Sequence, residues 1–248
     1  MARISLKDIS TKAPKEFDKA ETKQKIADMQ SEFRELQNLL FASNTYSLLV
    51  VIQGVDASGK DGAIRNVFSS GNPQGISVVS FKVPTEEEAS HDFLWRIHKN
   101  TPSKGMIQIF NRSHYEDILV TRVHKWCDDK TAFKRMKAIN DFEELLDDHN
   151  KTRVLKFYLH VSAEEQAERL KERMHNPAKM WKYNEKDFGE AALYDEYHKM
   201  YEDCFEHCDK IPWTIVPADQ NWYKEYLMIK TILETLRSLD MKYPGYKK

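Results

Sequence analysis

The sequence has little glycine, little cysteine and no long hydrophobic run. Only 8 of its 248 residues are glycine, where about 7% is ordinary. The sequence has three cysteines, a small and odd number that does not suit a disulfide framework. We therefore expect a reducing, cytoplasmic environment. The longest purely aliphatic run, residues 48–52, is far shorter than the roughly 20 residues of a membrane-spanning helix. No apolar segment follows the first basic residues, so we expect neither a secretory signal nor a membrane partner.

Charge of one sign is also missing. Lys and Arg number 38 against 39 Asp and Glu, which gives a formal net charge of −1. A nucleic-acid-binding protein is usually strongly basic, so nucleic acid is not an expected partner. The length suits one large domain or two small ones. Without an internal repeat or a flexible linker, we predict a single domain over residues 1–248.

Short apolar runs alternate with amphipathic stretches along the chain. The runs predict strands at 47–53, 76–82, 106–110, 154–161 and 213–216. Helices are expected at about 16–43, 60–69, 86–99, 113–125, 130–149, 162–175, 190–208 and 221–239. Thr85 with Glu88, and Ser162 with Glu165, have the spacing of capping boxes at helix starts. This alternation predicts an α/β fold with a parallel five-stranded sheet flanked by helices. Periodicity does not reveal the strand order.

Five of the eight glycines fall between residues 54 and 75. There the sequence Gly-Val-Asp-Ala-Ser-Gly-Lys-Asp, residues 54–61, follows a predicted strand and opens a predicted helix. That context is typical of a Walker A phosphate loop, whose main-chain N–H groups bind phosphate together with the helix N-terminus and a lysine. The expected phosphate-binding residues are Gly54, Ala57, Ser58, Gly59, Lys60 and Asp61. The alternative is a tight strand–helix turn with an incidental lysine.

Two carboxylates make this loop unusual. Asp61 stands where a Ser or Thr normally ligates Mg²⁺, and Asp56 lies inside the loop. Bound phosphates would repel Asp56 unless a metal or an accepting phosphate group lay between them. Asp56 is therefore predicted to be a Mg²⁺ ligand or to orient an acceptor. For Asp61, at the start of the helix, the alternative is that its charge only interacts favourably with the helix dipole.

A second candidate segment follows the third predicted strand and reads Asn-Arg-Ser-His-Tyr-Glu-Asp, residues 111–117. Ligands of open α/β sheets bind beyond the carboxyl ends of the strands, where this segment lies. Arg112 suits a phosphate clamp, and Asn111, Glu116 and Asp117 are expected near the nucleotide or the metal. On its own the segment could equally be a helix cap with a surface acidic pair.

A basic segment follows the fourth predicted strand. Residues 169–186 contain six Lys and Arg against two Glu, whereas residues 141–148 contain five acidic residues and no basic one. Such polarised segments in a neutral chain suit a polyanion site. We expect a lid over about 169–189 that closes on phosphates, although a solvated helix face explains the same charges.

Taken together, these motifs resemble polyphosphate kinase family 2. The resemblance covers about residues 25–240 and rests on the loop 54–61, on 111–117 with Arg122, on the lid pattern and on the closing stretch 212–219. It implies a P-loop kinase fold, homo-oligomers and Mg²⁺-dependent phosphoryl transfer between inorganic polyphosphate and a nucleotide (AMP, ADP, ATP or guanine analogues). The residues that it implies are Asp56 as catalytic carboxylate, Lys60, Arg112 and Arg122 on phosphates, and Arg169, Arg173, Lys179 and Lys182 in the lid.

Many family members have Asp where this chain has Asn111, and the form Asn-Arg-Ser-His-Tyr-Glu is similar to the subgroup that phosphorylates both nucleoside mono- and diphosphates. Two other functions share the loop. An ATP-dependent nucleoside monophosphate kinase would need no such basic channel, and a non-catalytic nucleotide-binding module could lose the lid cations.

Overall fold

The computed structural model describes residues 4–245, so the outermost residues of the expected domain, 1–3 and 246–248, lie outside the described residues. The strands are β1 (Ser47–Gln53), β2 (Ile76–Ser80), β3 (Ile107–Asn111), β4 (Thr152–His160) and β5 (Trp213–Pro217). The α-helices are α1 (Lys19–Ser43), α2 (Lys60–Val67), α3 (Glu86–Ala89), α4 (Trp95–His98), α5 (Val120–Val123), α6 (Asp129–Asn150), α7 (Ala163–His175), α8 (Lys186–Ala191), α9 (Tyr194–His207) and α10 (Asn221–Ser238). Short 3₁₀ turns are η1 (Leu6–Asp8), η2 (Pro73–Gly75), η3 (His114–Asp117) and η4 (Met180–Lys182).

The five strands form one parallel sheet in the order β2-β3-β1-β4-β5. This confirms the predicted fold class and supplies the strand order. All seven residues of the central strand β1 are buried, as a strand covered on both faces requires. Ile52 of β1 is paired with Asn111 of β3, so the loops that follow these two strands leave the sheet side by side.

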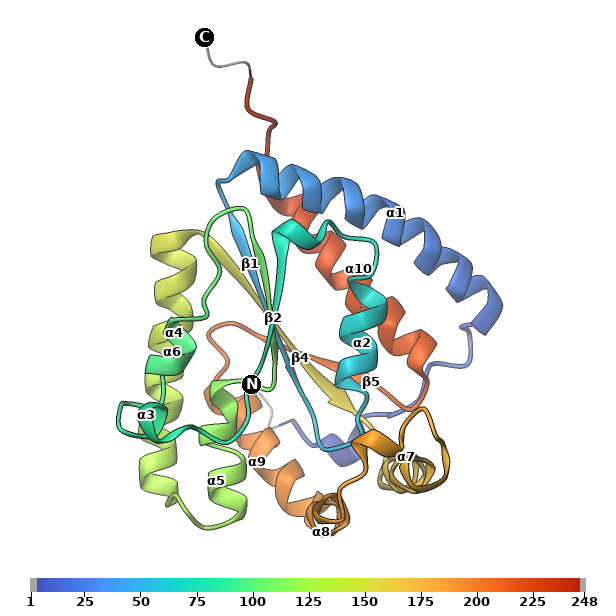
Figure 1. Ribbon diagram of the computed structural model, residues 1–248, viewed down its shortest axis with the longest axis vertical. Helices are drawn as coiled ribbons and strands as arrows, with labels where there is room; N and C mark the ends of the chain where they lie inside the picture. Colours follow the sequence, from blue (N-terminus) through green and yellow to red (C-terminus); the bar gives the residue numbers. More distant parts are fainter. Residues whose placement is uncertain (1–3, 246–248) are drawn as a thin grey trace.

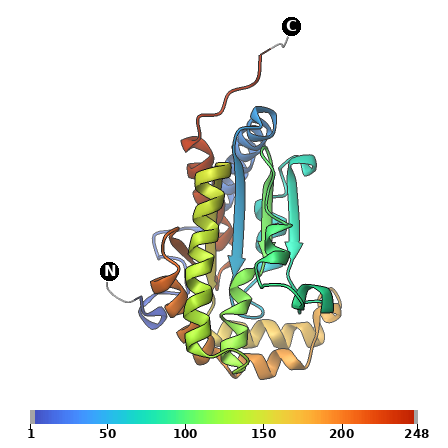
Figure 2. The same ribbon diagram turned by 90° about the vertical axis from the view of Figure 1, so that its left-hand side faces the viewer.

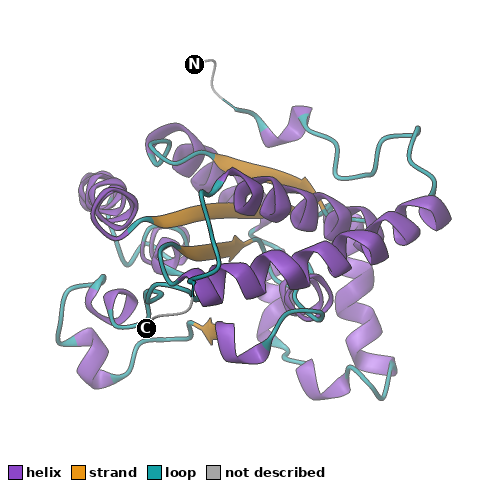
Figure 3. Cartoon of the chain, turned by 90° about the horizontal axis from the view of Figure 1, so that it is seen from above, coloured by secondary structure: helices purple, strands orange, loops and turns teal. Residues whose placement is uncertain are grey.

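Helices cover both faces of the sheet (Figures 1 and 2). Helices α1, α2 and α10 pack on one side, and α5, α6 and α9 on the other. Helix α1 begins where the Asp18 side chain accepts hydrogen bonds from two main-chain N–H groups and ends at Asn44 in the left-handed conformation. Seen from above, α1 and α10 run alongside each other over the sheet (Figure 3). No helix within residues 4–245 is long and apolar enough to cross a membrane.

The predicted helices 86–99, 113–125 and 190–208 are each broken. The first becomes α3 and α4 because the Asp92 carboxylate accepts the Leu94 N–H and turns the chain. The second becomes η3 and α5. The third departs only at its start, where residues 190–191 end α8, and the rest of it is α9. The capping box of Thr85 and Glu88 is confirmed. At the start of α7 Ser162 caps the Glu165 N–H, but the Glu165 carboxylate accepts a hydrogen bond from Arg169.

Candidate active site at the carboxyl edge of the sheet

Residues 54–59 connect the carboxyl end of β1 to the first residue of α2. The chain adopts positive φ angles at Ala57 (59°) and Gly59 (96°), a region that glycine occupies readily and alanine only with strain. A Cβ atom at residue 59 would also lie 2.5 Å from the Lys224 ammonium, so any other residue there would force this side chain to shift. The loop therefore has the tight turn before a helix N-terminus that phosphate binding needs.

Lys60, the first residue of α2, is only 8% exposed. Its ammonium donates hydrogen bonds to the main-chain oxygens of Gly54 (2.7 Å) and Val55 (3.0 Å). Burial, helped by the positive charge of Arg112, lowers the pKa of Lys60 from 10.5 to about 8. The side chain is thus a desolvated cation folded onto its own loop, and an anion placed there would gain a strong interaction.

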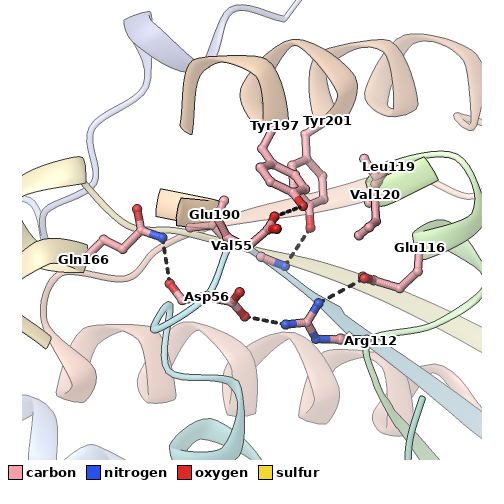
Figure 4. A pocket seen from close by; sticks show the side chains of 11 residues that line it. Val55, Asp56, Arg112, Glu116, Leu119, Val120, Gln166, Glu190, Tyr197 and Tyr201 are labelled. Atoms are coloured by element: carbon pink, nitrogen blue, oxygen red, sulfur yellow. Dashed lines mark hydrogen bonds and ion pairs between the residues drawn. The ribbon is translucent and has the colours of Figure 1, made fainter. Parts of the chain in front are cut away.

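Arg112 lies between two carboxylates (Figure 4). One of its terminal nitrogens is paired with Asp56, and the other donates to Glu116 at 3.0 Å. The charge of Glu116, together with that of Asp56, raises the pKa of Arg112. The second Glu116 oxygen accepts a hydrogen bond from Gln53 at 3.0 Å. The loop and the second candidate segment are therefore joined by one charged cluster.

This cluster faces a small cavity of about 20 Å³ (Figure 4), room for little more than a water molecule. Helices α8 and α9 close its far side with Glu190, Tyr197 and Tyr201. The Tyr197 hydroxyl donates to Glu190 at 2.6 Å, and the Tyr201 hydroxyl accepts the Gly54 N–H at 3.1 Å. The cavity therefore combines the acidic groups, the guanidinium and the mouth of the loop.

Asp61 joins three parts of the fold. It accepts a hydrogen bond from the Asn111 amide at 2.8 Å and is paired with Lys182 of η4. Burial raises the pKa of Asp61, but the hydrogen bonds from Lys182 and Asn111 outweigh this and lower it. Asp61 thus ties the end of β3 and the lid segment to the first turn of α2, beyond any effect on the helix dipole.

The other expected lid cations are also engaged by partners. Arg173 donates to Asp187 at 2.6 Å, and Lys179 is paired with Glu172. Arg169 donates to main-chain oxygens of the phosphate loop. The expected lid therefore begins on a residue that is fixed to the loop.

Of the expected site residues, Gly54, Asp56, Arg112 and Glu116 line this cavity, and two others are held by partners elsewhere in the fold. Arg122 donates to Asp129 and Asp203, each at 2.8 Å, on the side of α6 and α9. The Asp117 carboxylate faces Arg96 at 3.7 Å, and burial raises its pKa. Neither residue lines the cavity.

Sequence reasoning missed Lys224, Gln166 and the two tyrosines that line the cavity. Lys224 carried a signal, because it stands in the apolar stripe of α10 that Met228, Ile232 and Leu236 continue. A lysine in the buried face of an amphipathic helix requires a partner. Gln166, Tyr197 and Tyr201 fall in ordinary helical patterns and gave no comparable signal.

Within residues 4–245, no group of three His, Cys, Asp or Glu side chains is placed to hold a metal ion by itself. Mg²⁺ in kinases is commonly bound by one or two carboxylates together with substrate phosphates and water. Asp56, at the mouth of the loop and on the cavity, fits such a shared site.

Known proteins resemble this chain over nearly its whole length. The family described as polyphosphate kinase 2 matches residues 16–244. The AMP/ADP-polyphosphate phosphotransferase of Meiothermus ruber is 44% identical over 221 residues, 88% of this chain and 82% of that protein. The ADP-polyphosphate phosphotransferase of Rhodopseudomonas palustris is 41% identical over 224 residues, 85% of this chain and 77% of that protein. The crystal structure of polyphosphate kinase 2 from Arthrobacter aurescens is 37% identical, with a TM-score of 0.95, and covers 100% of this chain and 90% of that one.

Proposed function

The chain belongs to the polyphosphate kinase 2 family, and on this premise we propose how its site transfers a phosphoryl group between inorganic polyphosphate and a nucleotide. The reaction converts AMP or ADP to ADP or ATP, or runs in reverse. The observation that carries the proposal is the meeting of the phosphate loop with Arg112 at one edge of the sheet. A single P-loop kinase-like domain carries out the whole reaction.

The phosphate loop binds the end of the polyphosphate chain. Its main-chain N–H groups, the N-terminus of α2 and the Lys60 ammonium meet the phosphate oxygens. An oxygen of the acceptor's terminal phosphate attacks the terminal phosphorus of the polyphosphate. A new P–O bond forms, the bridging P–O bond breaks, and the polyphosphate leaves one unit shorter. Lys60 and Arg112 stabilise the negative charge that spreads over the transferred group.

Asp56 is the residue that would hold Mg²⁺, with Glu116 on the same cavity, while Asn111 donates to Asp61. Bound there, the ion would neutralise charge on the phosphate oxygens. Asp56 itself fixes Arg112 in place through their ion pair. Lys182 holds the lid segment against Asp61 at the start of α2, from where Lys179 and Arg173 can exchange their carboxylate partners for phosphate.

The terminal phosphate of the nucleotide approaches Asp56 and Arg112 at the mouth of this cavity, which is too small to hold the whole nucleotide. Acceptance of both AMP and ADP is supported by the 44% identity to the Meiothermus ruber enzyme, whose name gives both nucleotides. A cytoplasmic location and a homo-oligomeric state belong to the same proposal.

The test uses the purified full chain with Mg²⁺, long-chain polyphosphate, and AMP or ADP. We expect ADP and ATP to form, and formation to stop when EDTA removes the metal. Turnover of AMP with ATP but not with polyphosphate would instead identify an ATP-dependent nucleoside monophosphate kinase. Nucleotide binding without turnover of either donor would identify a non-catalytic module.

A further inference from the structure

The main-chain oxygens of the phosphate loop all have side-chain partners. Six consecutive carbonyls, from residue 54 to residue 59, accept hydrogen bonds from four side chains. Lys60 donates to Gly54 and Val55 (2.7 and 3.0 Å), Gln166 to Asp56 (3.0 Å), Arg169 to Ala57 and Ser58 (3.1 and 3.0 Å), and Lys224 to Gly59 (3.2 Å).

The direction of a carbonyl fixes the direction of the next N–H. A peptide unit is planar and trans, so its C=O and its N–H point in opposite directions. Donors that hold the carbonyls of residues 56–59 therefore also fix the N–H groups of residues 57–60. Of these, the Ser58 N–H donates within the loop to the Val55 oxygen at 3.2 Å. Phosphate oxygens bind main-chain N–H groups of such loops, so donors that fix the others preorganise the phosphate site before the substrate arrives.

We propose that Gln166 and Arg169 of α7 and Lys224 of α10 are positioning residues that hold the phosphate loop in its binding conformation. This inference rests on the proposed function. It assigns Arg169 to the support of the loop rather than to direct contact with polyphosphate. Its guanidinium already donates to four main-chain oxygens, those of Ala57, Ser58, Ala218 and Asp219, and to the Glu165 carboxylate.

The burial of these donors supports a role other than stability. Lys224 is fully buried and Gln166 is 2% exposed. Burial, with the nearby charge of Arg169, lowers the pKa of Lys224 to about 8, so the fold holds this ammonium at a cost. An apolar side chain of similar length would avoid that cost. Such a side chain would lack the two hydrogen bonds that the Lys224 ammonium donates, one to the Gly59 oxygen and one to the Asn221 side chain at 2.7 Å.

The four donors divide into two kinds. Lys60 belongs to the loop itself, and in the proposed function its ammonium binds phosphate. The Gly54 carbonyl would then lose its donor, whereas the Val55 carbonyl would keep the Ser58 N–H at 3.2 Å. The donors from α7 and α10 stay in place, so the other four carbonyls remain fixed while the substrate binds. The helices outside the loop therefore keep its shape independent of the catalytic lysine.

The test compares Lys224→Met and Gln166→Met with the control Lys230→Met, which removes a solvent-exposed lysine from the same helix. Steady-state kinetics give kcat and the KM for polyphosphate, and calorimetry gives the Kd for inorganic tripolyphosphate, which needs no turnover. Loss of one charge-assisted donor predicts a Kd and KM about ten- to a hundredfold higher for Lys224→Met. A smaller rise is expected for Gln166→Met, with wild-type values for Lys230→Met.

Two results would overturn the inference. One is a wild-type tripolyphosphate Kd and KM in both Lys224→Met and Gln166→Met. The other is activity that falls only in proportion to the folded fraction, with kcat reduced and KM and Kd unchanged, as a purely structural role would give. Gln166→Met tests the inference alone if Lys224→Met does not fold. A wild-type protein that neither binds tripolyphosphate nor turns over would overturn the proposed function, and this inference with it.

Discussion

Replacing Lys60 with methionine is expected to lower activity while leaving the fold at least as stable. The pKa of Lys60 falls from 10.5 to about 8 on folding, and each pKa unit corresponds to about 1.36 kcal/mol. Its charged form therefore costs the folded state about 3 kcal/mol at pH 7. The sign follows from linkage: between pH 8 and 10.5 the unfolded chain binds more protons, so the Lys60 contribution to stability rises with pH.

Methionine removes that cost but also removes two hydrogen bonds, to Gly54 and Val55, each worth about 1 kcal/mol. The net gain is about 1 kcal/mol, or roughly 2–4 °C in Tm for a chain of this size. Loss of a full charge aimed at phosphate is expected to lower kcat at least about a hundredfold.

Differential scanning fluorimetry with and without tripolyphosphate measures both effects. Tripolyphosphate at 100 times its Kd adds about 2.7 kcal/mol to wild-type stability, a Tm rise that the variant should largely lose. The reasoning would be refuted by a Tm drop of more than about 6 °C, which would mean that Lys60 stabilises the fold. It would equally be refuted by a kcat within tenfold of wild type.

Two further predictions concern buried groups away from the loop. Lys156 and Glu143 form a fully buried ion pair at 2.7 Å. Lys156→Met should therefore lower the free energy of unfolding by about 3–5 kcal/mol, because it leaves the buried Glu143 carboxylate without this cation. Adding Glu143→Gln should recover part of the lost Tm, and a double variant less stable than the single one would contradict this. Burial, with a contribution from His160, lowers the pKa of His198 to about 4. Because only the unfolded chain protonates this group below pH 6.5, unfolding experiments should show about 1.5 kcal/mol lost between pH 6.5 and 5. The variant His198→Phe should lose less over that range, and an equal loss would contradict the assignment.

The local sequence predicted most of the secondary structure because its signals act over a few residues. The run 47–53 matches β1 residue for residue, since a buried central strand is uniformly apolar. Thr85 and Glu88 form their capping box through contacts three residues apart. The predicted helix 86–99 was wrong in its middle, where the Asp92 side chain competes for the backbone, as aspartate does in turns.

Charged partners could not be predicted in the same way. The spacing of the motifs placed Lys60 and Arg112 at the same edge of the sheet. It did not reveal that Asp56 pairs with Arg112 or that Asp61 pairs with Lys182, because these partners are 56 and 121 residues apart. Nor did it show that Arg122 would be paired with Asp129 and Asp203. Any of several carboxylates could satisfy each cation until the helices were placed.

The sequence by itself determined the alternation of strands and helices and the position of the phosphate loop, because hydrophobic runs and glycines constrain the backbone locally. Tertiary structure decided the strand order, which puts β3 beside β1 and so brings Arg112 to the loop. It also decided what supports the loop. Lys224 reaches Gly59 across 165 residues of sequence, and only the packing of α10 against α2 makes them neighbours.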